Sequence, residues 1–245
     1  MSKPAAHVVA VALLVMLAAV AFSRIDYAWN WQAVWDYRGL LLKGWLFTVG
    51  LSLAALAVSC VVGFVAALAL GSRFRLVEAI ARVYVELIRG TPLLVQLLVG
   101  FYVVATAAKL ENRYVVGVIV LSLFSGAYLA EIFRAGIDAI PRTQRDSARA
   151  IGLTPWQAMR LVILPQAARL VVPPVAGQLV SLVKDSSLLS VIAINEFTQS
   201  AQEVNAATYS ALESYLPLAA GYLILTLPLS WLSRWLERRL KFEMG

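Results

Sequence analysis

The sequence predicts an all-α, polytopic membrane helix bundle of about six transmembrane helices. Of its 245 residues, 61% are hydrophobic and 14% are charged, and the mean hydropathy is +0.78. A water-soluble domain has roughly 45–50% apolar and about 25% charged residues, so a soluble fold would leave surplus apolar surface in water. The apolar residues also fall into charge-poor stretches near the roughly 20 residues that a helix needs to cross a bilayer. Lipid is therefore the expected solvent.

Six charge-poor stretches have the length and apolarity of membrane spans. They run from His7 to Phe22, Gly44 to Leu70, Thr91 to Ala108, Tyr114 to Ile132, Gln166 to Val183 and Tyr215 to Trp231. The first could instead be a signal peptide, because Lys3 precedes it and Ala19-Val20-Ala21 resembles a cleavage site; we expect an uncleaved helix. Because Lys184-Asp185 follows the fifth stretch, that region could be one span followed by a shorter apolar segment.

The basic residues predict the orientation of these spans. On the two sides of the membrane, Lys and Arg number 14 and 5. Cytoplasmic loops carry the excess of Lys and Arg, so the sequence predicts that both termini lie in the cytoplasm. The formal net charge of +7 then indicates orientation and lipid contact, and no nucleic-acid partner is expected.

Residue counts argue against several classes of enzyme. The chain has a single cysteine, Cys60, and a single histidine, His7, so an internal disulfide, a multi-histidine zinc site or a deep Ser-His pair is not expected. It has no glycine-rich phosphate loop, so any ATP must be bound by another chain, and no cofactor or metal is expected here. Two alternatives stay open: a membrane-embedded enzyme, for which no catalytic set is found, and a self-sufficient secondary transporter, for which no convincing internal repeat is found.

The longest cytoplasmic loop, Arg134 to Leu164, carries helix start and stop signals. Thr143-Gln144-Arg145-Asp146 resembles a capping box that opens a short helix, which Gly152 would close. Thr154-Pro155-Trp156-Gln157 predicts a second start. We expect two short helices at a sharp angle, with Ala148 and Ile151 forming an apolar face for docking into a groove. A plain interfacial connector is the alternative.

A loop motif and four further stretches resemble ABC importer permeases, and in particular their polar amino-acid branch. In the loop, Asp146-Ser147-Ala148, Gly152 and Val162-Ile163-Leu164-Pro165 match the spacing of the family's EAA loop, with conservative departures at Asp146, Ser147 and Val162. The other stretches similar to that branch are Glu86–Gln96, Ala127–Arg134, Leu164–Ala167 and Lys184–Ser190. The resemblance covers roughly Gly39 to Lys241, so the first helix looks like an addition to a five-helix core.

The resemblance implies a type I importer permease subunit of the bacterial inner membrane. Residues 1–40 would be an N-terminal membrane helix and periplasmic segment, and residues 41–245 the importer transmembrane domain. Such a subunit forms the translocation path for a polar or charged amino acid. Its implied partners are cytoplasmic ATP-binding subunits, a periplasmic amino-acid-binding protein, a second permease subunit in a homodimer or heterodimer, and membrane lipid.

In that family the EAA loop forms helices seated on the ATPase surface. The resemblance therefore assigns ATPase coupling to Asp146, Ser147, Ala148 and Gly152, within the loop 134–164. Gly152 also has an independent reason to be present, because a turn that needs positive φ between two helices is least strained with glycine.

Ionisable groups at membrane depth cost roughly 2.5–3.5 kcal/mol each on insertion scales, so they are functional candidates. Lys184 and Asp185 could receive the α-carboxylate and α-ammonium of a substrate. A helix broken at Ser186 and Ser187 would add backbone N–H donors beside Lys184. Either charged residue could instead pair with a neighbouring helix or reach toward an interface.

Two further polar residues are candidates for the substrate path. Gln96 follows the helix break predicted at Thr91-Pro92. Glu131 lies near the cytoplasmic end of its span, where Arg134, at i+3, offers a local ionic partner. A pairing of that kind would make Glu131 structural.

Overall fold

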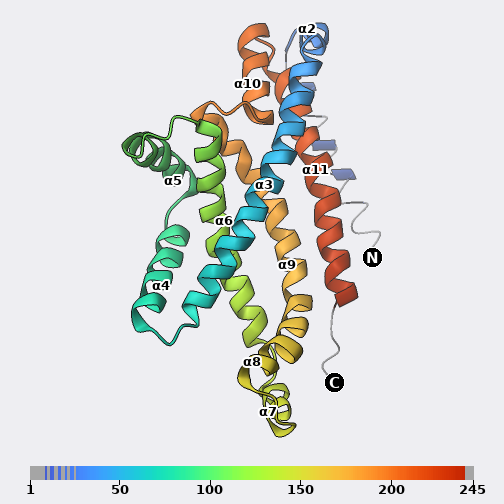
Figure 1. The fold of residues 1–245 in the computed structure, drawn as a ribbon. Helices are drawn as coiled ribbons and strands as arrows, with labels where there is room; N and C mark the ends of the chain where they lie inside the picture. Colours follow the sequence, from blue (N-terminus) through green and yellow to red (C-terminus); the bar gives the residue numbers. More distant parts are fainter. Residues whose placement is uncertain are drawn as a thin grey trace.

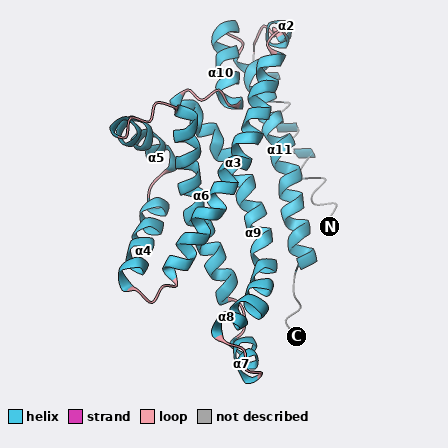
Figure 2. Cartoon of the chain, viewed as in Figure 1, coloured by secondary structure: helices cyan, strands magenta, loops and turns pink. Residues whose placement is uncertain are grey.

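The computed structural model describes residues 9, 12–13, 16–17, 20, 23–24 and 26–240. The predicted first span, 7–22, lies for the most part outside the described residues. From residue 26 to residue 240 all regular secondary structure is helical, and no strand occurs in the described part (Figure 2). The elements are α2 (Trp31–Trp35), α3 (Arg38–Leu70), α4 (Arg75–Gly90), α5 (Leu93–Val99), the π-helix η1 (Gly100–Ala105), α6 (Arg113–Asp138), α7 (Arg142–Ala150), α8 (Pro155–Ala158), the π-helix η2 (Met159–Ile163), α9 (Leu164–Asp185), the 3-10 helix η3 (Ser186–Ile192), α10 (Phe197–Thr208) and α11 (Ala211–Leu240).

Among the described residues, four helices are long and apolar enough to cross a membrane. They are Arg38–Leu70, Arg113–Asp138, Pro155–Ile192 and Ala211–Leu240. They include the second, fourth, fifth and sixth stretches of the sequence analysis, and the fifth is longer than expected because α8, η2, α9 and η3 continue one another. The all-α membrane fold is therefore confirmed.

Within the predicted third span, Thr91 to Ala108, the helical segment Leu93–Ala105 does not qualify as a span by itself. The chain instead bends by 109° between α4 and the segment Leu93–Ala105, and only the bent pair together passes as a span. Thr91 and Pro92 are both extended, with ψ of 144° and 137°. Proline disfavours the helical conformation of the residue before it and cannot donate a backbone hydrogen bond. The break that Thr91-Pro92 predicted is thus present, and it turns the chain sharply.

The centre of the molecule is the close contact between α3 and α6, which lie against each other in Figure 1. Glycine makes this approach possible. A Cβ added at Gly63 would lie 2.6 Å from Leu129 Cβ and 2.9 Å from the backbone oxygen of Gly126. Small residues at helix contacts are a common way to pack helices in lipid, where backbones gain dispersion by approaching closely. α9 then packs on α6 and α3, and α11 packs on α9.

The helix from Pro155 to Ile192 carries a proline pair in its middle. Pro173 and Pro174 cannot donate the backbone hydrogen bonds that a regular helix would place there. The hydroxyl of Ser233, on α11, donates to the backbone oxygen of Pro173 at 3.0 Å. A polar side chain from the neighbouring helix thus contacts the backbone at the proline pair.

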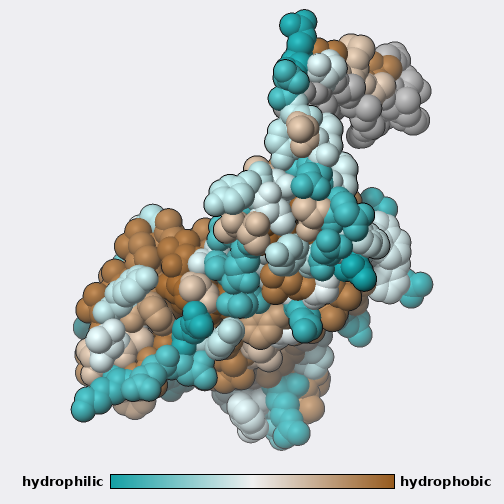
Figure 3. All heavy atoms as spheres, turned by 90° about the horizontal axis from the view of Figure 1, so that it is seen from above, coloured by the Kyte–Doolittle hydropathy of each residue, from teal (hydrophilic) through white to brown (hydrophobic). Residues whose placement is uncertain are grey.

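The two ends of the bundle are formed by different elements. Figure 1 shows α7 and α8 together at one end, and α2 and α10 at the opposite end. α11 runs from the α10 end back toward the α7 end (Figure 1). Viewed from the α10 end, Figure 3 shows apolar residues gathered on the side of α4 and α5 and polar residues nearer the middle.

Candidate functional site

α7 begins two residues earlier than the capping signal at Thr143 predicted. Pro141 is the N-cap residue, and it makes no side-chain cap hydrogen bond. Its ring fixes φ near −54°, but its ψ of 141° is extended, so the first helical residue is the one directly after it. The predicted box at Thr143–Asp146 is therefore wrong, because these residues lie inside the first turns of α7.

The end of α7 is a Schellman motif. Gly152 has φ +83° and donates its N–H to the backbone oxygen of Arg149 at 2.9 Å, while Leu153 N–H donates to Ala148 O at 3.1 Å. This is the pair of bonds that closes a helix through a left-handed residue. The prediction that Gly152 ends the first short helix in a positive-φ turn is confirmed.

The second start is also confirmed. Thr154 Oγ1 accepts from the N–H of Gln157 at 3.3 Å, and Gln157 Oε1 accepts from the N–H of Thr154 at 2.9 Å, with Pro155 in the first helical turn. The two residues satisfy each other's backbone donors. α8 does not end as a short helix, however, because η2 and α9 continue it.

The expected apolar docking pair is split between the inside and the outside of the subunit. Ala148 is only 2% exposed, so its side chain packs within this chain, whereas Ile151 is 77% exposed and Trp156 is 69% exposed. Asp146 and Ser147 are exposed as well. The surface available to a partner here is therefore formed by α7 polar residues together with Ile151 and Trp156.

Lys184 and Asp185 lie where α9 tightens into η3. Lys184 is exposed and Asp185 half-buried, and no ion pair within 4 Å joins either to another side chain in the described part of the chain. The expected helix break is absent. The Ser186 hydroxyl donates to Val183 O at 2.9 Å, and the Ser187 hydroxyl to Lys184 O at 2.6 Å.

The backbone N–H groups at the end of α9 are also hydrogen-bonded, because they donate to Leu182 O and Lys184 O. The free N–H donors expected at Ser186 and Ser187 are thus not available, because a 3-10 helix continues where a break was predicted. Lys184 is exposed and Asp185 half-buried, but no free backbone N–H donors of Ser186 and Ser187 lie beside them.

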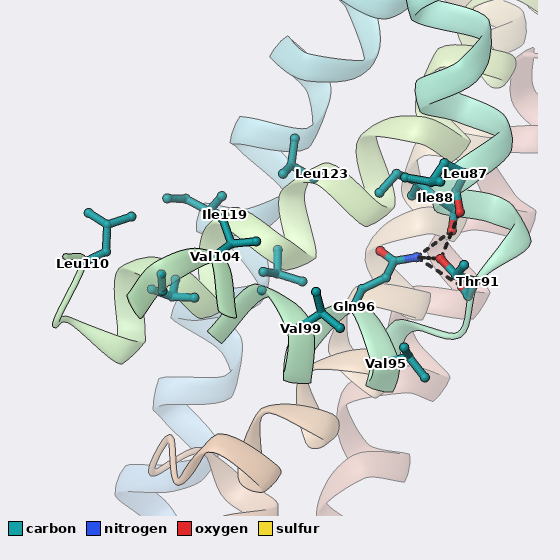
Figure 4. A pocket seen from close by; sticks show the side chains of 14 residues that line it. Leu87, Ile88, Thr91, Val95, Gln96, Val99, Val104, Leu110, Ile119 and Leu123 are labelled. Atoms are coloured by element: carbon teal, nitrogen blue, oxygen red, sulfur yellow. Dashed lines mark hydrogen bonds between the residues drawn. The ribbon is translucent and has the colours of Figure 1, made fainter. Parts of the chain in front are cut away.

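Gln96 makes hydrogen bonds across the α4–α5 bend. Figure 4 shows its amide pointing back to α4, where Nε2 donates to Ile88 O at 2.6 Å, Thr91 O at 3.1 Å and Thr91 Oγ1 at 2.8 Å. The backbone oxygen of Ile88 lies in the last turn of α4, where carbonyls have no partner in the helix. The surrounding cavity of about 410 Å³ is lined almost wholly by apolar side chains. Gln96 therefore stabilises the bend.

Glu131 makes an ion pair that the sequence analysis did not predict. Its Oε1 contacts Arg89 Nη1, at the end of α4. The predicted local partner, Arg134, instead reaches Asp138 Oδ2 at 3.5 Å. A contact between two helices replaces a contact within one, because the α4–α5 bend brings Arg89 beside α6.

Two buried glutamates at the α10 end were not predicted as important. Glu196 is fully buried and caps α10, accepting from Thr198 N–H at 2.9 Å and Gln199 N–H at 2.8 Å, and from the Tyr222 hydroxyl at 2.9 Å. Burial raises the pKa of the Glu196 carboxyl, while these donors act in the opposite direction. An acidic residue directly before the helical segment Phe197-Thr198-Gln199 is a helix-start signal that could have indicated this.

Glu213 holds the segment that precedes α3. It is fully buried, and it accepts from the Tyr27 hydroxyl at 2.6 Å and from the backbone N–H of Asn30. The two partners are more than 180 residues away in sequence. No local sequence pattern could have indicated that contact.

Known proteins resemble this chain over most of its length. The family described as binding-protein-dependent transport system inner membrane component matches residues 59–242. The glutamine transport system permease protein GlnP of Escherichia coli (strain K12) is 36% identical over 214 residues, covering 86% of this chain and 98% of that protein. The arginine transport system permease protein ArtQ of Bacillus subtilis (strain 168) is 32% identical over 202 residues, covering 82% of this chain and 92% of that protein.

A solved structure described as a crystal structure of an amino acid ABC transporter with histidines has the same fold. Its TM-score is 0.82 at 34% sequence identity, and the match covers 87% of this chain and 100% of that one. These matches do not favour a membrane-embedded enzyme or a secondary transporter. The chain belongs to the family of binding-protein-dependent transport system inner membrane components, and it is a multi-pass inner-membrane permease subunit of an ABC importer, a transport component and not an enzyme.

Proposed function

We propose that this subunit moves a polar or charged amino acid into the cell, driven by ATP that separate cytoplasmic subunits bind and hydrolyse. The relatives described for glutamine and arginine support an amino-acid substrate. The proposed partners are two ATP-binding subunits, a second permease subunit and a periplasmic amino-acid-binding protein. No cofactor is bound by this chain itself.

The observation that carries the coupling part of the proposal is the α7–Gly152–α8 turn. It presents Ile151 and Trp156, two large apolar side chains, at the end of the bundle. Exposed aromatic and aliphatic side chains on a rigid turn are suited to filling pockets on a partner. In the proposed complex the ATPase covers this surface, with Asp146, Ser147 and Gly152 at the contact and Ala148 holding α7 against its own subunit.

This assignment also fixes the orientation that we propose. The α7–α8 end carries Arg142, Arg145, Arg149 and Arg160, as the positive-inside rule expects of a cytoplasmic face. The C-terminus then lies on the cytoplasmic side and the α2–α10 end faces the periplasm. The buried carboxylates at the α10 end would keep that face in one shape for the binding protein.

Of the substrate-path candidates, we retain Lys184, Asp185 and Glu131. Lys184 and Asp185 offer opposite charges at membrane depth, and among the described residues neither makes an ion pair to another helix, so both can serve a passing zwitterion. Ser186 and Ser187 direct their hydroxyls to their own helix, so we propose that they shape the turn beside Lys184. We assign Gln96 to the bend that borders the path.

The coupling role is tested by changing backbone preference at Gly152. A side chain there meets no atom within 4 Å, but valine at φ +83° would cost about 1–2 kcal/mol or more. We expect Gly152→Val to abolish amino-acid uptake and binding-protein-stimulated ATP hydrolysis in proteoliposomes of the assembled importer, with its thermal midpoint little changed.

Gly152→Asn is the matched control. Asparagine adds a side chain of similar size but tolerates the left-handed conformation, so it should retain most of the activity. Wild-type coupling in the valine variant would remove the proposed role of this turn. Amino-acid uptake in the absence of any ATPase subunit would contradict the proposed function as a whole.

A further inference from the structure

The contact between Arg89 and Glu131 joins two helices on either side of the α4–α5 bend. Arg89 Nη1 contacts Glu131 Oε1, and the Arg89 guanidinium lies 5.2 Å from the centre of the Tyr128 ring. Both charged side chains remain open, at 40% and 45% exposure. The pair is therefore accessible from one side and is backed by an aromatic ring on the other.

The pair lies inside the apolar part of the molecule. α6 has 26 residues, which makes it about 39 Å long, and Glu131 is about 10 Å from its α7 end. A hydrocarbon core about 30 Å thick, centred on the helix, would then contain Glu131 about 6 Å from its edge. Tyr128 lies about one turn deeper.

The pair also faces away from α3. Glu131 is five residues from Gly126, which places the two about 140° apart around the helix axis. A Cβ at Gly126 would lie 2.8 Å from Val62 on α3 and 3.2 Å from the Tyr84 hydroxyl on α4, so both helices cover that side of α6. The charged pair lies further around α6, beside the end of α4.

An exposed ion pair at this depth is unfavourable if it faces lipid. Charged groups in the hydrocarbon cost several kcal/mol each, and they almost always face a water-filled cavity or another polar surface. The open side of Arg89 and Glu131 is therefore expected to face water or a polar surface rather than lipid.

We propose that Arg89 and Glu131 form a binding subsite for the zwitterionic backbone of an α-amino acid, near the α7 end of the path. Arg89 receives the α-carboxylate and Glu131 receives the α-ammonium, so the substrate replaces the contact between the two side chains. This subsite rests on the proposed function as an amino-acid importer.

The chemistry of the two groups suits this exchange. A guanidinium can donate two parallel hydrogen bonds to a carboxylate, and a carboxylate accepts from an ammonium with the same charge assistance. Tyr128 holds the guanidinium while its ionic partner changes. When the substrate leaves, Arg89 and Glu131 pair again, so neither charge is left without a partner.

The test separates a substrate contact from a simple tie between helices. The assembled importer, with its ATPase and second permease subunit, is reconstituted in liposomes and supplied with loaded binding protein. The probes are ¹⁴C-labelled glutamine, arginine, glutamate and histidine, and the readouts are the maximal uptake rate and the ATP hydrolysed per molecule imported. We expect Arg89→Gln and Glu131→Gln to lower uptake per ATP by about ten- to a hundredfold while stimulated ATP hydrolysis persists.

The decisive variant exchanges the two charges. Arg89→Glu combined with Glu131→Arg can keep an ion pair between α4 and α6 but reverses the field that a zwitterion meets. We expect this double variant to assemble and hydrolyse ATP without recovering uptake. Recovery of the wild-type uptake per ATP would overturn the proposal, because a tie between helices would then be sufficient.

Two controls complete the design. Arg82→Gln removes an ion pair with Glu78, at 2.7 Å, on the same helix α4, and it should leave uptake unchanged; an equal loss there would overturn the proposal. Arg89→Lys retains the charge and should recover part of the uptake if Arg89→Gln fails to assemble. A wild-type importer that accumulates none of the four amino acids would contradict the proposed function and the subsite together, whereas normal uptake by both glutamine variants would contradict the subsite alone.

Discussion

The α7–α8 end and the α2–α10 end of this bundle are held together by different kinds of contact. At the α7–α8 end, the bonds that shape the turn join residues three to five positions apart, as in Gly152 to Arg149 and Thr154 to Gln157. At the α2–α10 end, Glu213 binds Tyr27 and Asn30 across more than 180 residues, and Thr48 Oγ1 accepts from Phe197 N–H across 149 residues.

This difference indicates how each end can move. A turn stabilised by its own neighbours keeps its shape when it is displaced together with the helix ends that it packs against. An end stabilised by distant contacts keeps its elements fixed relative to one another. The arrangement is suited to a machine in which one end follows a moving partner and the other supplies a constant surface.

The largest effect is expected when Glu196, at the α2–α10 end, loses its carboxylate. Glu196→Ala would leave the N–H groups of Thr198 and Gln199 and the Tyr222 hydroxyl without their acceptor. We expect the free energy of unfolding to fall by about 2–3 kcal/mol, measured by denaturant titration in mixed micelles. Gln202→Ala, at an exposed position of the same helix, is the control and should have little effect. Equal stability of the two variants would show that the α10 end does not depend on this carboxylate.

A smaller effect is expected from the local cap at the opposite end. Thr154→Ala removes the acceptor for Gln157 N–H and should cost about 1 kcal/mol at the start of α8. Hydrogen exchange should rise at residues 154–158 and remain unchanged at α10, because the bond is local. Faster exchange at α10 would contradict the independence of the two ends. Thr154→Ser, which keeps the hydroxyl, should restore the protection.

The smallest effect on stability is expected at the exposed surface. Ile151→Ser removes no buried contact, so the free energy of unfolding of the subunit should change by less than about 0.5 kcal/mol. Its association with the ATPase subunits should weaken, because the side chain would fill a pocket there. Co-purification from detergent in a salt series measures this loss. Val191→Ser, exposed near the α10 end, should not weaken the association.

The sequence was sufficient for features that depend on local chemistry. The composition of the spans predicted the membrane fold. Gly152 predicted the left-handed turn in which it lies, and Thr154 with Gln157 predicted the N-cap of α8. Each of these depends on residues within a few positions, or on a single stretch of apolar residues long enough to cross lipid.

The features that could not be predicted depend on which distant residues meet. The pairing of Glu131 with Arg89 requires the bend at Thr91-Pro92 to be placed beside α6, and the burial of Glu213 requires the N-terminal segment to fold back onto α11. The break expected at Ser186 failed for a related reason, since the tertiary contacts of η3 stabilise a continued, tighter helix there. Pattern alone gives the position of a polar group along the chain but not its neighbour.

The long helix from Pro155 to Ile192 has a mechanical consequence. Pro173 lies near its middle, about 27 Å from each end by the rise of an α-helix. A change of about 10° in bend at Pro173 would therefore move one end by about 5 Å relative to the other half. That sideways displacement is about half the distance between the axes of two packed helices, enough to change which side chains are in contact. The position of the bend would then determine how far the backbone beside Lys184 moves when α8 is displaced.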